Sequence, residues 1–152
     1  MDWVNLHLMV NHFPIILGVA GALAGIAALL ARSPAIWKYA GVTVLLAGLT
    51  SPAAYISGSR AEEVVEDAWY VRHGEVEEHE ELGLYALIAL LAAGVAAAVS
   101  LWKPGPATRG VLVALSVVAV VVTAACALEG GEIVHESPAL EQARAPARRP
   151  GA

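Results

Sequence analysis

The stretch FPIILGVAGALAGIAALLA, from Phe13 to Ala31, decides the fold, because none of its 19 residues is Asp, Glu, Lys, Arg or His. Three further stretches of this kind follow it, over Tyr39–Ile56, Leu82–Trp102 and Val111–Leu128. Each stretch has 18 to 21 residues, and a helix of that length, at about 1.5 Å per residue, crosses a hydrocarbon layer of about 30 Å. The apolar runs are continuous, which favours helices over barrel strands. The sequence therefore predicts an all-α integral membrane protein with four transmembrane helices.

The connections between these stretches are unequal in length. Short polar turns, Arg32–Lys38 and Lys103–Gly110, join the first stretch to the second and the third to the fourth. The middle connection, Ser57–Glu81, is long and acidic. This pattern predicts an up-down-up-down four-helix bundle. Within the middle connection we expect a short interfacial helix from Ser59 to Tyr70, with a serine cap and membrane-surface aromatic residues.

The composition leaves room for one folded domain. With 58% hydrophobic residues among 152, little polar sequence remains for a separate soluble domain. We expect a four-helix membrane domain over residues 1–137 and a disordered tail over 138–152, which is rich in Ala, Pro and Arg. The lone Cys126 lies within the fourth stretch and excludes an internal disulfide framework.

Charge divides between the two sides of the predicted bundle. All 14 acids lie in the termini and the middle connection. The short turns contain no acid, and their basic residues are Arg32, Lys38, Lys103 and Arg109. By the positive-inside rule these turns face the cytoplasm, so we expect both termini on the periplasmic side. The net charge of −5 argues against a nucleic-acid partner, which requires a basic face.

Four histidines fall at the acidic ends of the predicted helices. His7 and His12 lie at the start of the first helix, His79 opens the third, and His135 closes the fourth. Ionisable side chains at membrane depth usually face a bundle interior or a polar cavity. Four histidines at one level, drawn from three helices, therefore indicate a bound cofactor or metal.

A b-type haem is the first group that fits, because its iron accepts imidazole ligands from one or two helices. Gly83 lies one turn from His79, and Gly131 one turn from His135, which leaves room for a flat ring. The leading hypothesis is membrane electron transfer through haem b, with a membrane or periplasmic redox protein as partner. The iron would be ligated by two of the three histidines His12, His79 and His135. His7 would be a supporting or alternative ligand.

A non-haem transition metal is the alternative, for metal binding or transport. Glu132 and His135 form a Glu-x-x-His pair on one helix face, as in di-iron bundles, but Val76 occupies the matching position before His79. The candidate ligands of such a site are His12, His79, Glu129, Glu132, His135 and Glu136. A third possibility is a cofactor-free structural subunit of a homo-oligomer or a larger membrane complex. The sequence has no hydrolase, transferase or phosphate-loop motif, and it leaves open whether the protein is an enzyme.

The segments HLMVNHFPI at His7–Ile15 and GGEIVHE at Gly130–Glu136, with Ser57-Gly58 after the second helix, also resemble a known group of proteins. It is a bacterial family of unknown function, predicted to be four-helix inner-membrane proteins that open with His-Pro-x-x-Val-His-Phe-Pro. Leu8 and Asn11 depart from its proline and valine. The resemblance, from His7 to Glu136, implies a bacterial inner-membrane location and a functional histidine-marked outer end. Some members are fused to or encoded near cytochrome-like modules, which points towards electron transfer.

Overall fold

The computed structural model describes residues 2–65 and 73–135, and within them every regular element is a helix. The helices are α1 (Trp3–Val10), α2 (His12–Ala31), α3 (Pro34–Val65), α4 (His73–Trp102) and α5 (Pro106–His135). Four segments are long and apolar enough to cross a membrane, namely Trp3–Ala31, Pro34–Val64, Val76–Trp102 and Pro106–Gly131. The predicted all-α class with four membrane-spanning helices is confirmed. The predicted tail, 138–152, lies outside the described residues.

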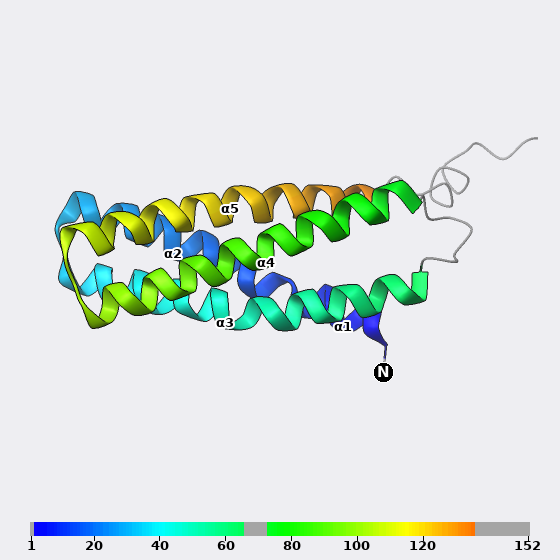
Figure 1. The fold of residues 1–152 in the computed structure, drawn as a ribbon, viewed down its shortest axis with the longest axis horizontal. Coiled ribbons are helices and arrows are strands. Elements are labelled where there is room, and N and C mark those ends of the chain that lie inside the picture. Colours follow the sequence, from blue (N-terminus) through cyan, green and yellow to red (C-terminus); the bar gives the residue numbers. More distant parts are fainter. Residues whose placement is uncertain (1, 66–72, 136–152) are drawn as a thin grey trace, which may run out of the picture.

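The helices lie side by side in an elongated bundle (Figure 1). The α2–α3 and α4–α5 turns lie at one end of it. The start of α1, the end of α3, the start of α4 and the end of α5 lie at the other end, which we call the acidic end because it carries the described carboxylates of α3, α4 and α5. Helix α3 packs against α2 and α4, α5 packs against α4 and α2, and α1 packs mainly against α3.

Two boundaries differ from the sequence-based expectation. The first span consists of two helices, with Asn11 between α1 and α2, and the side chain of Asp2 caps α1 by accepting from the Asn5 backbone N–H at 3.1 Å. Helix α3 continues to Val65. Ser59–Val65 therefore belong to α3 rather than to a separate interfacial helix, and the remainder of that predicted helix, 66–70, lies outside the described residues.

Helix α3 passes through Pro52 without ending. A proline has no N–H to donate to the carbonyl four residues earlier, which here is that of Gly48. The hydroxyl of Ser51 donates to this same carbonyl at 2.8 Å. The carbonyl therefore keeps a partner, as a polar group within a bilayer requires.

Small residues bring the helices into close contact. The glycine face of α2, which consists of Gly18, Gly21 and Gly25, is buried, whereas the bulky residues Ile16 and Leu23 are each 62% exposed. Between α3 and α4, a Cβ added at Gly48 would lie 2.9 Å from the Leu90 carbonyl oxygen and 3.1 Å from the Gly94 Cα. Glycine here allows two backbones to approach each other closely.

The turn end is held by an aromatic and cationic cluster. Trp37 of α3 is 4% exposed, and its Nε1–H donates to the hydroxyl of Ser100 in α4 at 3.2 Å. The guanidinium of Arg109 in α5 lies 5.3 Å from the centre of the Trp37 ring, within the range of a cation–π interaction. Trp37 therefore connects three helices at this end.

Substitution Gly48→Ala is expected to destabilise the bundle. The added methyl group would meet backbone atoms of α4, which cannot move independently of their helix, and such overpacking costs about 1–3 kcal/mol. Gly110→Ala is the matched control, because a Cβ at this helical glycine meets nothing within 4 Å. Unfolding curves in detergent micelles measure both variants, and equal stability of the two would contradict the packing described.

Candidate functional site

His7 is fixed against the neighbouring helix α3. Its Nδ1 lies 3.1 Å from the carbonyl oxygen of Ala54 and 3.3 Å from the hydroxyl oxygen of Ser57. The imidazole ring lies flush on α3 because a Cβ at Gly58 would stand 3.0 Å from its Cε1. A carbonyl oxygen can only accept, so Nδ1 carries the hydrogen of this bond. In the neutral ring the lone pair is then on Nε2.

His79 of α4 makes the same arrangement with α5. Its Nδ1 donates to the carbonyl oxygen of Cys126 at 3.1 Å, and a Cβ at Gly130 would lie 2.8 Å from its Cε1. In both cases the glycine follows the accepting residue by four positions, so it lies one helical turn further along the same face. The glycine and the carbonyl together form a seat for one imidazole.

This arrangement prepares an imidazole to bind a metal. Metal-ligating histidines commonly donate the N–H of the nitrogen that does not bind the metal to a backbone carbonyl, which fixes both tautomer and ring orientation. His7 and His79 both have this form. They also interact electrostatically with each other, which brings them into one region of the bundle. The structure therefore brings together these two of the four predicted histidines.

The other two predicted histidines are placed differently. His12 is exposed, and its Nδ1 lies 2.7 Å from the Leu8 carbonyl oxygen, one turn back along its own chain. It is held by its own turn and not by a neighbouring helix. His135 is the last residue of α5, and its side chain lies outside those described, as do the side chains of Glu132 and Glu136.

The predicted carboxylate–histidine metal site is not assembled in the part of the chain whose side chains are described. No three His, Cys, Asp or Glu side chains in that part lie close enough to hold a metal ion. His12, His79 and Glu129 therefore do not form a ligand group by themselves. Roles for Glu132, His135 and Glu136 stay predictions.

The two glycines predicted to lie beside a flat ring have open surroundings. A Cβ at Gly83 would meet only Tyr55 Cδ2, at 3.9 Å, and one at Gly131 would meet nothing within 4 Å. Neither glycine is required by close packing. Their predicted position beside a cofactor stays a prediction.

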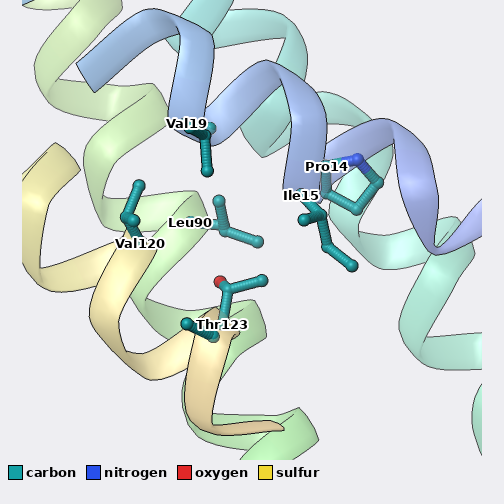
Figure 2. A pocket seen from close by; sticks show the side chains of 8 residues that line it. Pro14, Ile15, Val19, Leu90, Val120 and Thr123 are labelled. Carbon is teal, nitrogen blue, oxygen red and sulfur yellow. The ribbon is translucent and has the colours of Figure 1, made fainter. Parts of the chain in front are cut away.

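A small apolar cavity lies between α2, α4 and α5. Figure 2 shows Ile15 and Val19 of α2 around it with Leu90, Val120 and Thr123 from the other two helices. Its volume of about 40 Å³ is enough for a water molecule but far too small for a haem. We therefore place the candidate site at His7 and His79 and not in this cavity.

Gly58 and Gly130 are the site residues that the sequence-based prediction did not include. They have no chemical groups of their own, and they matter only because an imidazole rests on each of them. Their spacing could have identified them. Gly130 follows Gly58 by 72 residues, as His79 follows His7.

No protein-family model, curated protein or solved structure matches this chain. The resemblance to the four-helix family with the His-Pro-x-x-Val-His-Phe-Pro opening therefore stays a prediction. The class that the structure itself defines is an α-helical, multi-pass membrane protein.

Substitution Gly130→Ala is expected to displace the His79 imidazole without unfolding the bundle. The methyl group would meet the end of a side chain and not a backbone, so the ring can turn away from Cys126. The rate at which diethyl pyrocarbonate modifies His79, followed by peptide mass spectrometry, should then rise several-fold. Gly131→Ala is the control and should leave the rate unchanged. An unaltered rate in Gly130→Ala would contradict the seat described.

Proposed function

We propose that this chain is a bacterial inner-membrane electron-transfer protein that holds b-type haem near the acidic end of its bundle. The observation that supports this most is the form of His7 and His79, which lie on different helices and each donate Nδ1–H to a backbone carbonyl. The Nε2 lone pairs then remain for a metal. A b-type haem needs such imidazoles and no covalent attachment to the chain.

The number of available donors favours haem over a bare metal ion. The macrocycle supplies four ligands to its iron, so two imidazoles complete the coordination. A bare transition-metal ion usually takes about four ligands from the protein and water. The described side chains provide no group of three. A non-haem site therefore depends on Glu132, His135 and Glu136, and it is the second candidate.

When bound, haem would supply one-electron redox chemistry. The chain's own residues would do the rest of the work. Ala54 and Cys126 would orient the two imidazoles through their carbonyls, and Gly58 and Gly130 would let each ring lie close to its helix. The acidic end would attract a redox partner with a basic surface.

The proposal includes a membrane orientation. Both short turns, with Arg32 and Lys103, would lie in the cytoplasm, and the acidic end would lie in the periplasm. The topology is then up-down-up-down with both termini outside.

Alkaline phosphatase is active only after export, so fusions to it test this orientation. A fusion after Ala152 should be active, and one inserted after Pro104 should be inactive. The reverse pattern would place the histidine end in the cytoplasm and exclude a periplasmic partner.

The test of haem binding is the visible absorption spectrum of the purified protein, expressed with sufficient haem supply. A Soret band, with α and β bands that sharpen on reduction by dithionite, is the expected result. A colourless protein would overturn the haem proposal. Elemental analysis of untagged protein would then separate a non-haem metal site from a cofactor-free structural subunit.

A further inference from the structure

The two halves of the chain have the same plan, displaced by 72 residues. Helix α3 begins at Pro34 and α5 at Pro106. In the first turns of these helices, the Trp37 N–H donates to the Ser33 carbonyl and the Arg109 N–H donates to the Gly105 carbonyl. Both pairs of equivalent residues are again 72 positions apart.

The histidine seats obey the same displacement. His7, Ala54 and Gly58 correspond to His79, Cys126 and Gly130. Both hairpins, α1–α2–α3 and α4–α5, start and finish at the acidic end (Figure 1). Two repeats that run in the same direction are related by an axis along the bundle, and ligands commonly bind at the interface of such repeats.

Contacts between equivalent residues locate this axis. Two equivalent residues can meet only where they lie on opposite sides of the axis that relates them. Arg109 lies over the ring of its counterpart Trp37 at the turn end, at 5.3 Å. His7 interacts electrostatically with its counterpart His79 at the acidic end. The pseudo-twofold axis therefore runs from the Trp37–Arg109 contact to the space between the two histidines.

We propose that the chain is a duplicated helical hairpin whose two halves form one binding site for a transition-metal centre on the pseudo-twofold axis. Nε2 of His7 and Nε2 of His79 are its equivalent ligands. This inference rests on the proposed function for haem as the natural occupant, but the ligand pair stands on the repeat alone.

The repeat also excludes the other histidines from the pair. The counterpart of His12 is Leu84, and the counterpart of His135 is Glu63. Glu63 is exposed and forms an ion pair with Arg60 at 3.0 Å. Only His7 and His79 are histidine in both halves.

Asparagine variants test the pair with little disturbance of the fold. The amide of Asn can donate from near the position of Nδ1–H, so His7→Asn and His79→Asn keep a donor for the helix carbonyl and remove Nε2. His12→Asn is the matched control. Each full-length protein, in detergent, is titrated with haemin by absorbance and, separately, with Cu²⁺ by electron paramagnetic resonance, since Cu²⁺ binds imidazole most strongly among the divalent first-row ions.

The expected result is a loss of affinity on the order of tenfold or more in both His7→Asn and His79→Asn, with no change in His12→Asn. Haem binding that persists unchanged in either variant of the pair would overturn the pair and leave the proposed function standing. Cu²⁺ binding through both histidines without haem binding would overturn the proposed function and support the pair. A wild-type protein that binds neither probe would overturn the pair.

Discussion

Hydrocarbon offers no hydrogen-bond partner, so every polar group within the span of this protein depends on a partner from the chain itself. The constraint explains why the spans are helices. It also explains two local arrangements: Ser51 donates to the carbonyl that Pro52 leaves without its usual partner, and His7 and His79 donate to carbonyls of adjacent helices. A helical carbonyl has a second lone pair, and it can accept from an imidazole without losing its helical bond. The histidines are thereby satisfied and, at the same time, held in one tautomer.

The second requirement is space. A carbonyl in a helix is screened by neighbouring side chains, and an imidazole reaches it only where a neighbour on the same face is small. Gly58 and Gly130 meet this requirement one turn beyond Ala54 and Cys126. Gly48 and Gly94 act in a different way, since they allow two backbones to approach each other. Glycines therefore serve both the packing of the bundle and the orientation of its histidines.

The sequence predicts the spans well because continuous apolar runs have few alternative explanations in a chain of this composition. It does not predict the division at Asn11 or the continuation of α3 to Val65, since neither position has a strong helix-stop signal. It identifies the histidine-rich end, but it ranks His12 above His7. That ranking reflects position alone, whereas the structure shows His7 seated on α3 and His12 exposed. The hydrogen-bond partners are backbone carbonyls, which any residue supplies and no motif reveals. The 72-residue displacement is the one sequence signal that relates the two seats.

The central claim is that two equivalent imidazoles hold their Nδ1–H on helix carbonyls and keep Nε2 free for a metal. Nitrogen NMR of metal-free protein labelled at histidine tests it directly, with His7→Asn and His79→Asn used to assign the signals. We expect both residues to be neutral, with hydrogen on Nδ1 and an unprotonated Nε2, near neutral pH. Hydrogen on Nε2 of either ring would contradict the claim, because that ring would then have no lone pair to offer a metal from this position.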